Sequence, residues 1–107
     1  MTARDQLQRA RARIKALKDN LPDSYEVEST WVQEYHDAID GLESELSLQL
    51  TEFRLPQSAL YQSVASSNYL TGDVTYRRGM WCQVTVLLQK ADALLYYLSD
   101  LYGESAR

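Results

Sequence analysis

The chain has 107 residues, of which 45% are hydrophobic and 24% charged, and its formal net charge is −4. This size and composition are those of one ordinary globular domain. A single cysteine excludes an internal disulfide framework, and the sequence contains no apolar run of membrane-spanning length. The Arg-rich opening lacks the apolar core of a signal peptide, so we expect a cytoplasmic protein without a membrane partner.

The charges are distributed unevenly along the chain. Residues 1–20 carry a net +4, residues 21–55 carry −8, and residues 56–107 are neutral. Complementary charges on successive segments favour packing of one segment along the other. The basic first segment is also compatible with contact to an external polyanion.

Residues 3–20 are predicted to form the first helix, because they consist largely of Ala, Arg, Leu, Gln and Lys. Their apolar positions recur every three and four residues, which is a heptad seam typical of coiled-coil packing. The seam consists of Leu7, Ala10, Ile14, Leu17 and Leu21. Pro22 ends this helix, because the residue before a proline is disfavoured in the helical conformation.

Residues 29–47 are predicted to form the second helix. Its apolar positions repeat the same spacing at Val32, Tyr35, Ile39, Leu42 and Leu46. Two seams of this length, joined by a proline turn, predict an antiparallel helical hairpin. A glycine inside a helix costs about 1 kcal/mol relative to alanine, so we expect a packing reason for Gly41.

Residues 48–76 show no sustained periodicity and are predicted to form an irregular, Tyr-rich connector. Turn-forming clusters occur at residues 66–68 and 71–73. A compact domain seldom contains so long a stretch without structure, so we expect its own Leu, Phe and Tyr side chains to pack it against the helices.

Residues 77–102 are predicted to form a long third helix, with Gly103 as its left-handed cap. A second, thinner apolar stripe lies nearly opposite the main stripe of this helix and consists of Cys82, Val86, Ala93 and Tyr97. We interpret this stripe as an interface in a homo-oligomer. The alternative is that residues 47–78 of the same chain cover it.

Together these elements predict a single all-α domain over residues 1–107. It would consist of the antiparallel hairpin, the irregular connector and the third helix packed along the hairpin as a helical bundle.

We expect no enzyme, no metal and no cofactor. The lone histidine, His36, shares one side of its helix with Asp40 and Glu43, but the paired Cys or His ligands of a typical metal site are missing. Cys82 has no histidine near it in sequence to activate the thiol. Asp92 is the best candidate for an acid–base carboxylate, although we expect a basic side chain from elsewhere in the chain to pair with it.

Four basic side chains share one side of the first helix and form a possible polyanion-contacting ridge: Arg4, Arg11, Lys15 and Lys18. No aromatic residue alternates with them, and the pI of about 4.9 is far below that of a typical nucleic-acid-binding domain. Pairing with the acidic second helix therefore explains the ridge better than nucleic acid does.

The second half of the chain resembles a group of small uncharacterised bacterial proteins. The similar stretches are residues 53–56, 68–72, 75–76 and 90–97. This group has no assigned activity, so the resemblance implies no mechanism. It does imply that residues 53–75 form a structured insertion between helices.

The function we expect is a non-catalytic helical interaction module that self-associates and acts as an accessory or regulatory subunit of a larger bacterial protein. The alternative is a nucleic-acid-associated regulator that uses the basic first helix. Either function leaves the identity of the protein partner open.

Overall fold

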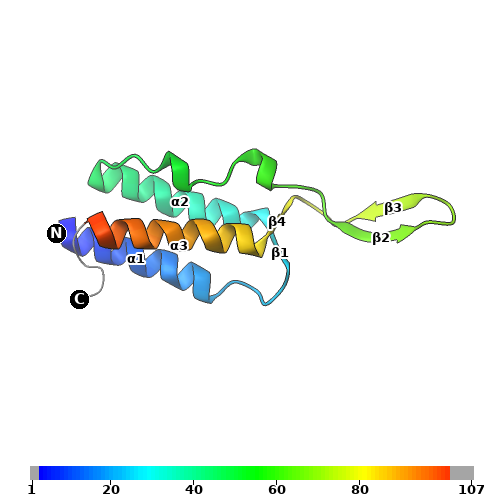
Figure 1. Ribbon diagram of the computed structural model, residues 1–107, viewed down its shortest axis with the longest axis horizontal. Coiled ribbons are helices and arrows are strands. Elements are labelled where there is room, and N and C mark those ends of the chain that lie inside the picture. Colours follow the sequence, from blue (N-terminus) through cyan, green and yellow to red (C-terminus); the bar gives the residue numbers. More distant parts are fainter. Residues whose placement is uncertain (1–2, 102–107) are drawn as a thin grey trace.

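The computed structural model describes residues 3–101 and shows that the fold is mixed α and β (Figure 1). Its α-helices are α1 (Ala3–Asp19), α2 (Ser29–Leu46) and α3 (Val84–Leu101). Its strands are β1 (Glu26–Glu28), β2 (Val64–Asn68), β3 (Asp73–Tyr76) and β4 (Trp81–Gln83). Two short 3₁₀ turns, η1 (Thr51–Phe53) and η2 (Gln57–Ala59), lie between α2 and β2. The expectation of an all-α domain is therefore wrong.

The strands form two small antiparallel sheets. One pairs β1 with β4, placing Val27 opposite Cys82, and the other pairs β2 with β3 as a hairpin. These strands are only three to five residues long, too short for a recognisable alternation of apolar and polar residues. The pairing of β1 with β4 joins segments that are more than fifty residues apart in the sequence.

The expected long third helix is shorter at its start, because residues 77–83 are not helical. Gly79 has a positive φ of 81°, which turns the chain into β4, and α3 begins only at Val84. Trp81 and Cys82, expected on the helix, are buried residues of β4. The expected helix end at residue 102 and the expected cap Gly103 lie outside the described residues.

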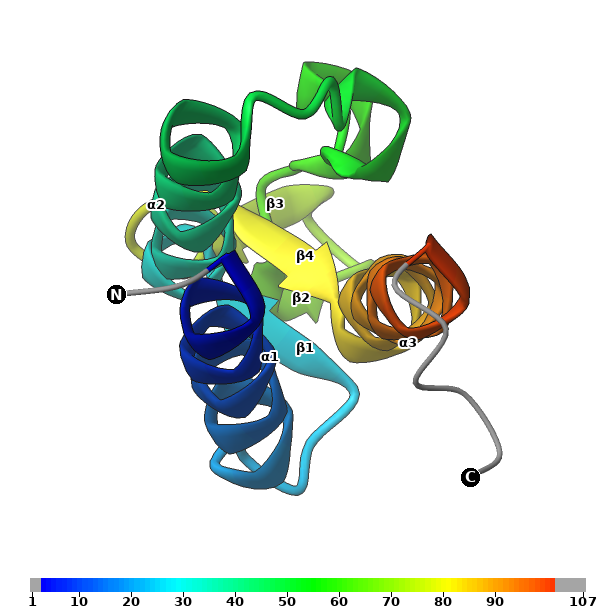
Figure 2. The same cartoon turned by 90° about the vertical axis from the view of Figure 1, so that its left-hand side faces the viewer.

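The two heptad seams are buried, but they do not form a coiled coil. Leu7 and Ile14 of α1 and Tyr35 and Ile39 of α2 belong to one core that also contains side chains of α3. Viewed along the long axis, α3 lies beside α1, and the segment between α2 and β2 lies above α2 and α3 (Figure 2). The helical-bundle and coiled-coil expectation is therefore wrong, since a strand pair and an irregular segment complete this core.

The irregular segment after α2 is held in place by hydrogen bonds between its backbone groups and side chains of α2 and α3. The hydroxyl of Tyr35 donates to the carbonyl of Phe53 at 2.9 Å, and the amide of Leu50 donates to the carboxylate of Glu43 at 2.8 Å. From the other side, Lys90 of α3 donates to the carbonyl of Glu52 at 2.7 Å. The segment is thus anchored to two helices at once.

No packing reason for Gly41 is found. A Cβ atom built at this position would meet nothing within 4 Å outside the helix backbone. The residue also lies within α2, with no positive φ to require glycine.

We therefore expect Gly41→Ala to raise the free energy of unfolding by about 1 kcal/mol, which is the difference in helix propensity between the two residues. Urea unfolding followed by circular dichroism measures this change. A lower stability in the variant would show that the groove between α1 and α2 needs the space that glycine leaves.

Candidate functional site

The most exposed element of the protein is the β2–β3 hairpin, residues 64–76, which we call the hairpin arm. It projects from one end of the helical body, away from the end where α1 begins and α3 ends (Figure 1). The molecule measures 61 × 25 × 19 Å, whereas an 18-residue helix is only about 27 Å long. Every residue of the hairpin arm is exposed.

The tip of the hairpin arm is an ordered turn that exposes two apolar side chains. The carbonyl of Asn68 accepts a hydrogen bond from the amide of Gly72 at 2.7 Å, and its side-chain oxygen accepts one from the amide of Leu70 at 3.0 Å. Gly72 has a φ of 79°, which suits the turn. Tyr69 and Leu70 are 94% and 91% exposed, respectively, at the end of this turn.

The hairpin arm has one apolar and one polar face. Val64 pairs with Tyr76, and Ser67 pairs with Val74. Residues directly opposite each other share a face, as do residues two apart on one strand, so Val64, Val74 and Tyr76 form an apolar face that also carries Ser67. The opposite face carries two pairs of polar residues, Ser66 with Thr75 and Asn68 with Asp73.

The two edges of the hairpin arm differ. The pairing register of β2 shifts between Val64 and Ser66, which marks a bulge around Ala65, whereas β3 is regular. A bulge twists an edge strand and hinders pairing with another strand. The outer edge of β3 has neither a bulge, a proline nor a lysine, and β3 has no second neighbouring strand in the described part of the chain.

The root of the hairpin arm is attached to the helical body by a polar cluster around Glu26. The hydroxyl of Ser63 donates to the Glu26 carboxylate at 2.7 Å, and the guanidinium of Arg77 lies 3.6 Å from it. The buried hydroxyl of Tyr61 is the main cause that lowers the pKa of Glu26, with Ser63 second. Burial raises the pKa of Tyr61, and the neighbouring Glu26 carboxylate adds to this shift.

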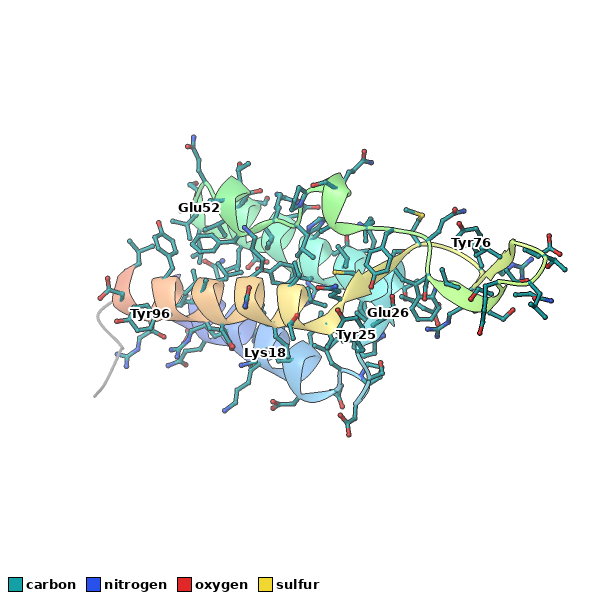
Figure 3. All side chains as sticks on the ribbon, turned by 45° about the vertical axis from the view of Figure 1, so that its right-hand side comes forward. Lys18, Tyr25, Glu26, Glu52, Tyr76 and Tyr96 are labelled. Atoms are coloured by element: carbon teal, nitrogen blue, oxygen red, sulfur yellow. The ribbon has the colours of Figure 1, made fainter. Side chains whose placement is uncertain are left out.

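Backbone hydrogen bonds continue through this root. Tyr61 and Trp81 exchange two of them, at 2.9 and 2.8 Å, and the amide of Arg77 donates to the carbonyl of Ser63 at 2.7 Å. The guanidinium of Arg77 also stacks over the Trp81 ring, 3.5 Å from its centroid. Figure 3 shows Glu26 at this junction and Tyr76 farther out on the arm. The hairpin arm is therefore fixed at its base, not joined by a loose linker.

The predicted interface stripe on the third helix is divided between several environments. Cys82 is fully buried in β4, Val86 and Tyr97 are half-buried, and Ala93 is exposed. The ring of Tyr97 packs on Phe53 of η1, with 5.1 Å between the ring centroids. The chain thus covers part of the stripe with its own segment. Self-association through these four residues stays a prediction.

The predicted basic ridge on α1 contributes to internal contacts. Lys18 forms an ion pair with Asp92 of α3, which supplies the partner expected for this carboxylate. Arg4 and Lys15 are exposed, and Arg11 is half-buried. We expected the ridge to pair with the acidic helix α2. Asp40 and Glu43 of that helix pair instead with Arg54, from the segment after α2.

The candidate metal ligands on α2 have structural roles instead. Arg54 binds both carboxylates. The hydrogen bond from the Leu50 amide is the main cause that lowers the pKa of Glu43, and Arg54 adds to it. The amide of Leu55 donates to Nε2 of His36 at 3.0 Å, so this nitrogen serves as an acceptor. Among residues 3–101 no group of three or more His, Cys, Asp or Glu side chains is placed to hold a metal ion.

Burial raises the pKa of the Cys82 thiol, which opposes formation of a reactive thiolate.

No helix in the described range 3–101 combines the length and the apolar character needed to cross a membrane.

The residues of the hairpin arm were missed as a site by the sequence analysis. The signal that pointed to them was the β-branched and aromatic run Val74-Thr75-Tyr76, facing Val64 across a turn that contains Asn68 and Gly72. It was interpreted as turns within an irregular connector, because β2 is mostly Ser and Ala.

The comparisons with known proteins give no match: no protein family, no curated protein and no solved structure is significantly similar to this chain. The function is therefore argued from the geometry of the hairpin arm and its root.

The contact between Leu55 and His36 predicts a pH dependence of stability. Burial is the main cause that lowers the pKa of His36 from 6.5, and the charge of Arg54 adds to it. The neutral ring therefore stabilises the fold fully above the unfolded pKa, and this contribution is lost as the pH falls through the lower, folded pKa.

We expect His36→Gln, whose amide oxygen still accepts but does not titrate, to lose less stability than the wild type between about pH 7.5 and pH 5. Urea unfolding of both proteins across this range checks the prediction, and equal pH dependence would contradict it.

Proposed function

We propose that this protein is a non-catalytic interaction module that self-associates through its hairpin arm and serves as an accessory or regulatory subunit of a larger assembly. The observation that carries the proposal is an amphipathic two-stranded ribbon that projects from the body with an apolar tip, Tyr69 and Leu70.

The energetics of the hairpin arm support a partner. An isolated two-stranded hairpin is only marginally stable in water, and stable sheets need a third strand or packing on a helix. Within residues 3–101, the hairpin arm has neither beyond its root. Its apolar face, with Val64, Val74 and Tyr76, is about half exposed and would gain free energy by leaving water.

A second copy of the chain is the partner that fits the hairpin arm. The outer edge of β3 presents unpaired backbone groups that another β3 edge matches group for group. The arm also carries little net charge, with Asp73 near its tip and Arg77 at its root, so two antiparallel arms bring opposite charges together. A cytoplasmic location belongs to this proposal, because Cys82 is a free thiol.

The test compares the mass of the wild type with that of a variant carrying Val74→Lys and Tyr76→Lys. We expect the wild type to be a dimer at about 100 μM in sedimentation equilibrium, because self-association of a small interface falls in the micromolar range. The variant should be monomeric, since lysines on an edge strand oppose pairing. Its helix content should not change, because both side chains lie outside the helical body.

The matched control is Tyr96→Lys, which removes an even more exposed aromatic side chain from α3, away from the hairpin arm (Figure 3). This control should dimerise like the wild type. A wild type that stays monomeric at about 100 μM, or dissociation by Tyr96→Lys with the arm variant intact, would refute self-association through the hairpin arm.

A further inference from the structure

We infer that two copies join by antiparallel pairing of β3 with the β3 of the second copy, in the one register that places Val74 opposite Tyr76 and Thr75 opposite itself on a two-fold axis. This inference rests on the proposed self-association and specifies its geometry. It predicts a four-stranded sheet shared between the two chains, with β2 at both outer edges.

The backbone of β3 leaves only alternate residues free to pair. The amide of Arg77 donates to Ser63 across the hairpin ladder. Backbone groups of an antiparallel strand point alternately to the two sides, so Asp73 and Thr75 also direct theirs toward β2. Val74 and Tyr76 therefore direct their amides and carbonyls to the open edge.

When a second β3 pairs with this edge, residues whose backbone groups point outward must lie opposite residues of the same kind. Three neighbouring registers meet this condition. Pairing Val74 with itself would place Tyr76 opposite Gly72, whose amide is already bound to Asn68. Pairing Tyr76 with itself would place Val74 opposite Arg78, whose carbonyl already accepts from the Trp81 ring nitrogen at 3.0 Å. The register with Val74 opposite Tyr76 pairs every outward group of both strands.

This register also matches the side chains. Val74 and Tyr76 lie on the apolar face of each arm, so their pairing makes the apolar faces of the two arms continuous. On the other face, Asp73 of one copy lies opposite Arg77 of the second copy, and the two-fold axis creates this pair twice. Asp73 is exposed, and the Arg77 side chain is still 43% exposed beside Glu26.

The outer edge of β2 is less suited to this pairing. The bulge at Ala65 disfavours the alternative in which the arms pair through β2.

Cysteine substitution tests the register in the full-length chain. In an antiparallel sheet, residues opposite each other without mutual hydrogen bonds have Cα atoms about 4.5 Å apart, within the range of a disulfide. We expect Thr75→Cys to form an interchain disulfide under mild oxidation. The matched control is Ser66→Cys, on the same face and also exposed, whose two copies would be about 14 Å apart across three strand spacings.

A second variant tests the charge pairs. Asp73→Lys replaces two attractive cross-strand pairs by two repulsive ones and should weaken dimerisation about tenfold, as measured by sedimentation equilibrium. Asp100→Lys, on α3 and outside the hairpin arm, makes the same change of charge and should leave dimerisation unchanged.

The outcomes separate this inference from the proposed function. A dimeric protein in which Ser66→Cys is oxidised as readily as Thr75→Cys, or in which Asp73→Lys has no more effect than Asp100→Lys, would overturn the register while leaving self-association intact. A wild type that is monomeric throughout would overturn both. The buried native Cys82 is present in every variant and provides the common background.

Discussion

The structure depends on the contact between Arg54 and the two carboxylates Asp40 and Glu43. This contact fixes the segment after α2 against that helix, and the Tyr35 hydroxyl and His36 hold the same segment by its backbone. The half-exposed charges of such a network contribute modestly to stability. Their larger effect is on the path of the chain, because the segment returns along α2, covers part of α3 and ends at the root of the hairpin arm.

The root holds the hairpin arm in a fixed direction relative to the helical body. β4 pairs with β1 on one side and with Tyr61 on the other, so one short strand joins the helical body to the arm. Glu26 is the centre of the junction, since it lies between the segment of Tyr61 and Ser63 and the side chain of Arg77. A carboxylate that is half-buried among hydroxyls and a guanidinium is stabilised in its charged form. Ser63 and Arg77 satisfy this carboxylate, whereas the buried hydroxyl of Tyr61 has no hydrogen-bond partner among the described residues.

The sequence was sufficient to predict α1 and α2, because each has a sustained 3–4 spacing and a proline or polar boundary. It was insufficient for the strands, since Glu26–Glu28 is too short to show a period and Trp81–Gln83 runs directly into the apolar pattern of α3. Arg54 was missed for another reason: the basic first helix offered more numerous partners for the acidic second helix. Only the turns of the hairpin arm were recognisable, because β2 is poor in β-branched residues. The pairing of β1 with β4 joins residues distant in sequence, whereas the hairpin arm is a local pairing with a weak strand pattern.

Because the hairpin arm extends away from the three helices, it influences how many partner molecules one assembly can bind. Chains joined only at their arms keep their helical bodies on opposite sides of the junction, so neither body covers the other. Such an arrangement is bivalent, and a target carrying two matching sites at that spacing would be bound with an avidity well above that of either body alone. A rigid spacer makes this gain selective, because targets whose sites are spaced differently receive none of it.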